Sequence, residues 1–132
     1  MLRRIAMVFG IVFLLVGLVG LFTPGGMSMG ADPAPASILG MFPVNLLHNI
    51  VHLLVGVWGL VAARSWNGSK MFFQVGGVVY IVLAILGFVI PTTFGLIPIG
   101  GNDIYLHAVL GVIMAGIGFT AKPEAAAAPT TA

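Results

Sequence analysis

The sequence predicts an all-α membrane protein, a bundle of four transmembrane helices built from two tandem helical hairpins. Only 6% of the 132 residues are charged and 60% are hydrophobic, whereas soluble domains are about 25% charged. Four apolar segments have the ~20 residues that a helix needs to cross ~30 Å of hydrocarbon. The second pair of segments repeats motifs of the first pair. We therefore expect two hairpins related by a pseudo-two-fold axis along the membrane normal.

The four helices are expected at about residues 5–22, 44–63, 71–90 and 103–119, within a transmembrane domain that spans 1–120. Helices are expected because an open strand would leave backbone groups unpaired in lipid. The three connections are a long loop rich in Pro, Gly and Met, a short polar turn at Ser65–Lys70, and the Pro- and Gly-containing stretch Pro91–Gly101. The tail at 121–132 is rich in Ala, Pro and Thr and is expected to be disordered.

The basic residues predict the orientation in the membrane. They precede the first helix, flank the turn between the second and third helices, and follow the fourth: Arg3, Arg4, Arg64, Lys70 and Lys122. The other two loops contain no Lys or Arg, so the positive-inside rule places both termini, including the tail, in the cytoplasm. We expect a multi-pass protein of a bacterial inner membrane. The alternative, that the first segment is a cleaved signal peptide, is disfavoured by its long apolar stretch and by its internal repeat.

Two histidines occupy matching positions in the repeat. Phe9–Gly17 resembles Gly76–Ala84, and His52-Leu-Leu-Val-Gly-Val resembles His107-Ala-Val-Leu-Gly-Val. If the halves pack symmetrically, His52 and His107 approach one another at a similar depth. A histidine in lipid requires a partner, so this pair is the best functional clue in the chain.

One face of the second helix is polar in its outer half and lined by small residues in its inner half: Asn45, His48, Asn49, His52, Gly56, Gly59 and Ala63. The fourth helix repeats this pattern with Asp103, His107, Gly111, Ala115 and Gly118. Small residues let neighbouring helices approach closely. We therefore expect a compact bundle whose polar pocket opens toward the outside.

The spacing of His48 and His52 is typical of helical metal sites, and His107 can supply a third nitrogen. Zinc and copper both suit imidazole ligands. Asn45, Asn49 and Asp103 are the candidates to hold these histidines in place, and Asn45 or Asp103 could instead supply an oxygen ligand. For Asp103 the favoured role is a helix N-cap, together with Asn102.

Other interpretations of the histidines remain open. His52 and His107 could bind haem as a bis-imidazole pair, and one histidine suffices for a chlorin. The polar residues could instead only hydrogen-bond across helices, with Asn45 and Asn49 tying loops to helix starts. Three methionines in the outer loop resemble the soft ligands of copper-handling loops, but methionine is also ordinary interface filler: Met27, Met29 and Met41.

The sequence gives little support for catalysis or nucleic-acid binding. There is no cysteine, and the three acidic residues form no arrangement with serine and histidine. The net charge of +2 is too small and too dispersed for a nucleic-acid surface. We expect a non-catalytic structural or accessory protein, a subunit of a larger membrane complex or a homo-oligomer. A small transporter or conduit for a metal ion or proton is the alternative, although the inner half offers only glycines and apolar residues. A haem-based membrane oxidoreductase is the weaker alternative.

The segment Phe42-Pro-Val-Asn-Leu-Leu-His-Asn-Ile-Val-His-Leu-Leu-Val-Gly-Val-Trp-Gly, followed by Gly77-Val-Val-Tyr, Gly95-Leu-Ile-Pro and Leu106-His107, resembles a known family. This is a bacterial family of small four-helix integral membrane proteins, defined only as a domain of unknown function. The resemblance spans roughly Arg4 to Phe119, and its most specific part is the Asn-x-x-His-Asn-x-x-His segment. Its pattern falls on Asn45, His48, Asn49, His52, Asp103 and His107. It implies a bundle fold and carries no activity, substrate or cofactor.

Overall fold

The structure, a computed structural model, describes residues 1–32 and 34–123. Its elements in chain order are α1 (Leu2–Phe22), β1 (Ala36–Ile38), β2 (Phe42–Val44), α2 (Leu46–Ala62), α3 (Trp66–Val89) and α4 (Asn102–Thr120). The tail predicted to be disordered falls mainly on residues 124–132, which lie outside the described residues.

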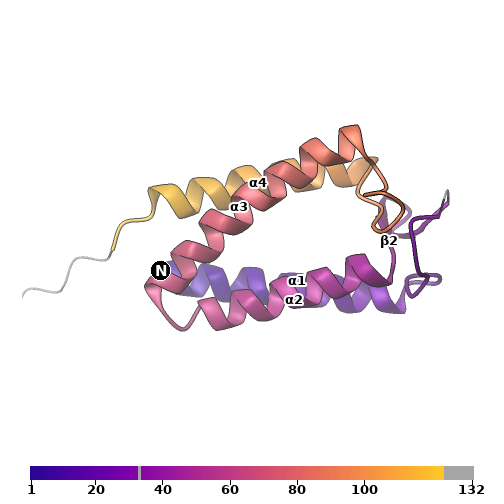
Figure 1. The fold of residues 1–132 in the computed structure, drawn as a ribbon. Helices are drawn as coiled ribbons and strands as arrows, with labels where there is room; N and C mark the ends of the chain where they lie inside the picture. Colours follow the sequence, from indigo (N-terminus) through magenta and orange to yellow (C-terminus); the bar gives the residue numbers. More distant parts are fainter. Residues whose placement is uncertain (33, 124–132) are drawn as a thin grey trace, which may run out of the picture.

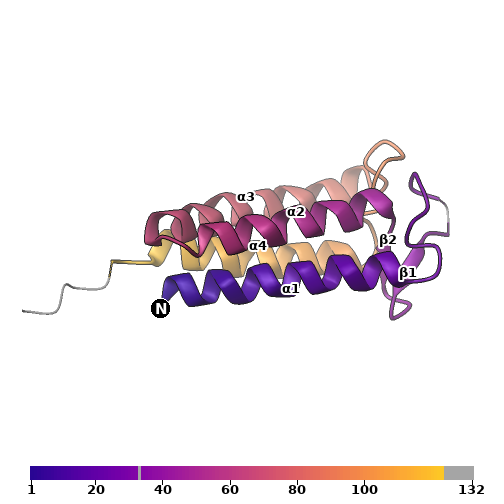
Figure 2. The same cartoon turned by 90° about the horizontal axis from the view of Figure 1, so that it is seen from below.

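The four helices form two antiparallel hairpins, α1 with α2 and α3 with α4 (Figures 1 and 2). The N-terminus and the end of α4 lie at one end of the bundle, and the two long loops lie at the other (Figure 1). This arrangement confirms the predicted fold class of a four-helix bundle made from two tandem hairpins.

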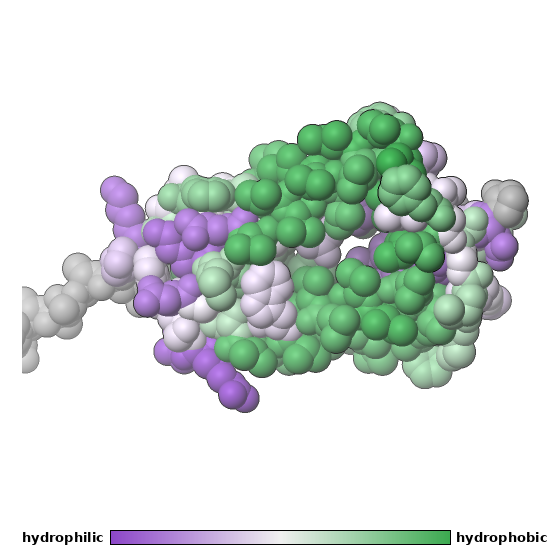
Figure 3. Space-filling view, viewed as in Figure 1, coloured by the Kyte–Doolittle hydropathy of each residue, from purple (hydrophilic) through white to green (hydrophobic). Residues whose placement is uncertain are grey.

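The helices are suited to a bilayer. By length and composition, α1, α3 and α4 can each cross a membrane, while α2 is equally apolar but has 17 residues. Hydrophobic residues cover most of the visible surface along the helices, and hydrophilic residues gather at the end where α1 begins (Figure 3). Apolar side chains on these outer faces are about half exposed, such as Val12 at 50% and Val19 at 52%. The chain is therefore a membrane protein.

The repeat predicted from sequence is visible in the packing of both hairpins. A Cβ atom on Gly56 would lie 2.9 Å from the carbonyl oxygen of Gly10. In the second hairpin, a Cβ atom on Gly111 would lie 3.1 Å from the carbonyl oxygen of Gly77. These are equivalent positions of the repeat. Each hairpin is thus closed at the same place by backbones that approach too closely for any side chain.

The turn between the hairpins is shorter than predicted, because α3 begins at Trp66 rather than near Met71. Ser65 caps this helix, and its side chain accepts a 3.0 Å hydrogen bond from the backbone N–H of Gly68. The Ser69 hydroxyl then donates to the carbonyl of Ala62 at 3.1 Å, which ties the start of α3 to the end of α2. Polarity in this stretch therefore reflects helix capping and not a longer loop.

The first long loop contains a small β-hairpin that the sequence analysis did not predict. Its strands β1 and β2 pair antiparallel around a turn in which Leu39 and Gly40 both have positive φ, 55° and 69°. The two long loops also join directly, because the N–H of Ala31 donates to the carbonyl of Gly95 at 2.9 Å. Together they cover the end of the helices opposite the N-terminus (Figure 1).

Candidate metal centre

Two histidines and one aspartate meet between the hairpins, in the half of the bundle nearer the two long loops. His48 comes from the first turn of α2, while Asp103 and His107 come from the first two turns of α4. One ligand atom from each lies within 4.8 Å of the other two. All three side chains are buried, with relative exposures of 4%, 2% and 1%.

The distances within this cluster suit a shared metal ion better than direct hydrogen bonds. The Nε2 atoms of His48 and His107 lie 3.6 Å and 3.7 Å from Oδ2 of Asp103. A charge-assisted N–H···O bond measures only about 2.7–2.9 Å. Ligand atoms held about 2.0–2.1 Å from a tetrahedral zinc ion are separated by roughly 3.4 Å. The carboxylate oxygen therefore lies at nearly the distance from each nitrogen that separates two ligands of one zinc ion.

The repeat explains why these residues meet. His48 and Asp103 occupy equivalent positions of the two hairpins, and so do His52 and His107. The His48 and His52 rings are 4.7 Å apart, and the His48 and His107 rings are 6.2 Å apart. His52 thus lies beside the cluster, but it is not among the three residues whose ligand atoms converge.

Two aromatic rings lie beneath the histidines on the pseudo-two-fold axis. Phe13 of α1 packs on His52 with ring centroids 6.0 Å apart, and Tyr80 of α3 packs on His107 at 5.3 Å. Phe13 and Tyr80 stack on each other at 5.5 Å with planes 12° apart. They occupy equivalent positions of the repeat, so the two halves meet through a ring pair that supports both imidazoles. Neither residue was predicted as part of the site, although the alignment of Phe9–Gly17 with Gly76–Ala84 pairs them.

Several buried polar atoms at this site have no hydrogen-bond partner within residues 1–32 and 34–123. They are Oδ2 of Asp103, Oδ1 of Asn49 and the Nδ1 atoms of His48, His52 and His107. Leaving such a group unpaired costs about 1–3 kcal/mol, so native structures rarely cluster them without a reason. A metal ion bound beside Oδ2 of Asp103 would supply the missing partner of that oxygen.

The two asparagines hold the outer loops in place. The Asn45 side-chain amide donates to the carbonyls of Gly30 and Leu96 at 2.8 Å and 2.7 Å, and its oxygen caps α2 by accepting from the N–H of His48. The Asn49 amide donates to the carbonyl of Gly26 at 2.9 Å. All of these bonds go to the backbone, as expected for residues that tie loops to helix starts. Both side chains are completely buried.

The capping role predicted for Asp103 is wrong. The residue before α4 is Gly101, and no side chain caps this helix. The Asp103 carboxylate points instead toward the two histidines. Gly101 has a φ of 65°, which brings the chain into the helix from a conformation that favours glycine. Asp103 consequently enters the bundle interior as the only buried carboxylate among the described residues.

Two cavities flank the cluster on opposite sides of the bundle. The smaller, about 70 Å³, lies between α2 and α3 and is lined by all three histidines together with Tyr80. Figure 3 looks toward this side and shows hydrophilic atoms inside a hollow between the hairpins. The larger, about 300 Å³, lies between α1 and α4 beneath the β-hairpin and is lined by His48, His52 and Asp103 among apolar residues.

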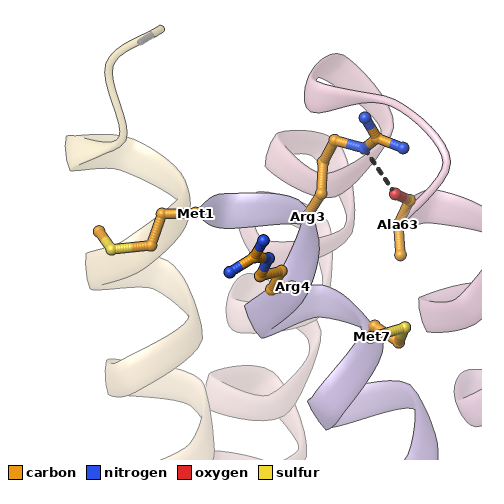
Figure 4. Close-up of a pocket in the computed structure, with 5 residues that line it drawn as sticks. All are labelled: Met1, Arg3, Arg4, Met7 and Ala63. Atoms are coloured by element: carbon orange, nitrogen blue, oxygen red, sulfur yellow. Dashed lines mark hydrogen bonds between the residues drawn. The ribbon is translucent and has the colours of Figure 1, made fainter.

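A further hollow, about 740 Å³, lies at the opposite end of the bundle and contains none of these residues. It is lined by Met1, Arg3, Arg4, Met7 and Ala63 (Figure 4). The Nε–H of Arg3 donates to the carbonyl of Ala63 at 2.9 Å, which anchors the start of α1 to the end of α2. This basic surface belongs to the end of the bundle and not to the histidine site.

The methionines of the outer loop do not join the histidine site. Met27, Met29 and Met41 have side chains that are 60%, 68% and 49% exposed, and none lines either cavity beside the cluster. The described structure therefore does not bring the soft sulfur ligands to the imidazoles.

Comparison with known proteins identifies a family. Residues 3–120 match the family described as a domain of unknown function (DUF4383). No curated protein and no solved structure matches the chain.

Proposed function

The chain belongs to the DUF4383 family, a domain of unknown function, and we propose that it is a non-catalytic membrane protein that binds a divalent transition-metal ion between its two hairpins. His48, Asp103 and His107 are the proposed ligands. The observation that carries the proposal is the convergence of their ligand atoms within 4.8 Å in a buried site. Zinc is the proposed ion, since it accepts two imidazoles, one carboxylate and a fourth exogenous ligand. Copper is the competing ion.

A metal at this position would join the two halves of the molecule. His48 belongs to the first hairpin, whereas Asp103 and His107 belong to the second. Binding to the folded state alone stabilises it by RT ln(1 + [L]/Kd), about 2.7 kcal/mol at a hundredfold excess over Kd. A structural or accessory role follows from this placement, because the ion would hold the hairpins together beneath the outer loops.

The packing of the inner half supports a structural role over a conduit. Phe72, Phe73 and Met114 are completely buried below the aromatic pair of Phe13 and Tyr80. An ion or proton pathway needs polar groups or water along its length. These side chains offer neither between the cluster and the end of the bundle that carries Arg3.

The proposed orientation has both termini in the cytoplasm of a bacterial inner membrane. Arg3 and the end of α2 meet at the end of the bundle where α4 finishes. This end carries the hydrophilic surface seen in Figure 3. The proposed orientation satisfies the positive-inside rule, because it places the basic residues on the cytoplasmic side. It also places the metal site near the outer leaflet.

Metal analysis of the purified protein tests the proposal. The full chain, purified in detergent from cells grown with zinc and copper, is expected to hold about one equivalent of metal per chain. His107→Ala and Asp103→Asn should each lower the affinity for zinc at least about tenfold, since removing one of three protein ligands costs more than the 10–100-fold seen for their outer supports. His52→Ala should retain the metal, which separates the observed ligand set from one that includes His52.

Two results would overturn the metal proposal. One is a wild-type protein that holds no metal and does not gain thermal stability when zinc or copper is added. The other is a Soret absorbance band lost in His52→Ala or His107→Ala, which would assign the site to haem. Native mass analysis tests the accessory role, which predicts a complex well above the 13.7 kDa of one chain.

A further inference from the structure

The larger cavity beside the cluster has features of a second binding site, which shares His48 and Asp103 with the metal site. It is about 300 Å³, at the lower end of the ~300–1,000 Å³ typical of small-molecule sites. The cavity lies between α1 and α4, and the β-hairpin covers one end of it. Most of its lining is apolar: Leu15, Val16, Val19, Ile38, Phe42 and Leu106 are representative.

Three polar side chains that line this cavity are more than nine-tenths buried. His48, His52 and Asp103 have relative exposures of 4%, 7% and 2%. Each carries an atom without a hydrogen-bond partner among the described residues: Nδ1 of both histidines and Oδ2 of Asp103. A ligand that brings oxygen atoms to these side chains would pair groups that are otherwise costly to bury.

The cavity reaches the lipid-facing surface of the bundle. Leu15 and Val19, which line it, are 55% and 52% exposed on the outer face of α1. Leu39, at the tip of the β-hairpin, lines it as well and is 82% exposed. A molecule dissolved in the bilayer can therefore enter sideways between α1 and α4 without crossing water.

The lining also determines which head group would fit. No Lys or Arg among the described residues lines this cavity, and the carboxylate of Asp103 would repel a phosphate or a fatty-acid carboxylate. The best match is an uncharged, planar head with oxygen atoms on an apolar tail. Histidine Nδ1–H groups can donate to its carbonyls, Asp103 can accept from a hydroxyl, and the Phe42 ring supplies an aromatic contact.

We propose that the cavity between α1 and α4 binds an isoprenoid quinone or quinol, with its head group at His48, His52 and Asp103 and its tail along Leu15 and Val19 toward the lipid. This proposal goes beyond the metal site and does not require the metal to be bound. It assigns binding only and includes no redox step.

Photolabelling of the full chain in lipid nanodiscs tests this site. The probe is an azido-substituted quinone with a decyl tail, competed with unlabelled decylubiquinone, with laurate as an anionic amphiphile and with dodecanol as a simple alcohol. Labelling is expected on peptides from the second half of α1 and from the β-hairpin. Decylubiquinone should compete at least about tenfold better than laurate or dodecanol, because only its head engages several of the buried polar groups.

A matched pair of tryptophan substitutions checks the location. Val19→Trp fills the cavity from its outer wall and should weaken decylubiquinone binding about tenfold through overpacking. Val12→Trp introduces the same side chain at an equally exposed position of α1 that does not line the cavity. It should change binding by less than about twofold. Because both positions face lipid, neither substitution should prevent folding.

The metal and quinone proposals can fail separately. His107 does not line this cavity, so His107→Ala removes a metal ligand but no group of the quinone site: it should lose metal while decylubiquinone still competes for labelling. His52→Leu should do the reverse, retaining metal and weakening decylubiquinone about fivefold through one lost hydrogen bond. Equal labelling of Val19→Trp and Val12→Trp, or equal competition by laurate and decylubiquinone, would overturn the quinone assignment.

Discussion

Asn45 is the side chain on which the outer end of the molecule most depends. It makes three hydrogen bonds: two donated by its amide to the carbonyls of Gly30 and Leu96, and one accepted from the N–H of His48. Each bond of this kind contributes about 1 kcal/mol, and the bond to His48 is also the N-cap of α2, a feature worth about 1 kcal/mol. Asn45→Ala is therefore expected to lower the free energy of unfolding by about 3 kcal/mol.

Two further substitutions at this position separate the contributions. Asn45→Ser retains a cap acceptor and loses both amide donors, so it should cost about 2 kcal/mol. Asn45→Asp also retains the cap, but it places a carboxylate oxygen against two carbonyl oxygens and should cost at least as much as alanine. The expected order of stability is asparagine, then serine, then alanine and aspartate. Unfolding in mixed micelles, followed by the fluorescence of Trp58 and Trp66, measures it. An Asn45→Asp protein as stable as wild type would refute the reasoning, because donation to both loops would then be unnecessary.

Other substitutions test the packing and the orientation. Gly56→Ala should destabilise the protein by about 2 kcal/mol, since its Cβ would lie 2.9 Å from the Gly10 carbonyl. Gly116→Ala, with nothing within 4 Å, should instead be neutral or stabilising by up to about 1 kcal/mol through helix propensity. Equal unfolding midpoints for the two variants would show that the close helix approach is not needed. A reporter fused after residue 132 should be active only if it folds in the cytoplasm, and activity of a periplasmic reporter there would reverse the orientation. Replacing Phe13 with alanine should weaken metal retention as well as stability, because Phe13 stacks on Tyr80, which packs on the ligand His107; unchanged metal occupancy would restrict Phe13 to a packing role.

Much of the fold follows from signals that are local in the chain. The length of the four apolar segments predicts the helices. The similarity of the segments that begin at His52 and His107 predicts that the two hairpins pack in the same way. The close contact of Gly56 with Gly10, and of Gly111 with Gly77, agrees with that prediction. The β-hairpin was not predicted because its turn places Leu39, a residue with a branched apolar side chain, at a positive φ. Turn propensities do not lead one to expect leucine there.

The site was predicted in outline, and its details depended on tertiary structure. The spacing of His48 and His52 and the repeat at His107 predicted three histidine ligands. Spacing along one helix does not determine which of its rings faces a second helix. Asp103 has the sequence context of an N-cap, and only the backbone conformation of Gly101 shows that its side chain enters the bundle instead. The quinone-sized cavity could not be predicted at all, because its walls come from α1, α4 and the unpredicted β-hairpin.

The equivalence of His48 and Asp103 has a consequence for how such a site can arise. In an assembly of two identical hairpins, any residue at this position appears twice, so the axis would be flanked by two imidazoles or by two carboxylates. Carrying both copies on one polypeptide removes that restriction and lets each copy mutate alone. A neutral nitrogen donor can then face an anionic oxygen donor across the axis. Covalent linkage thus gives this small protein a site with one carboxylate, whereas a symmetric dimer of the second half would carry two and a symmetric dimer of the first half would carry none.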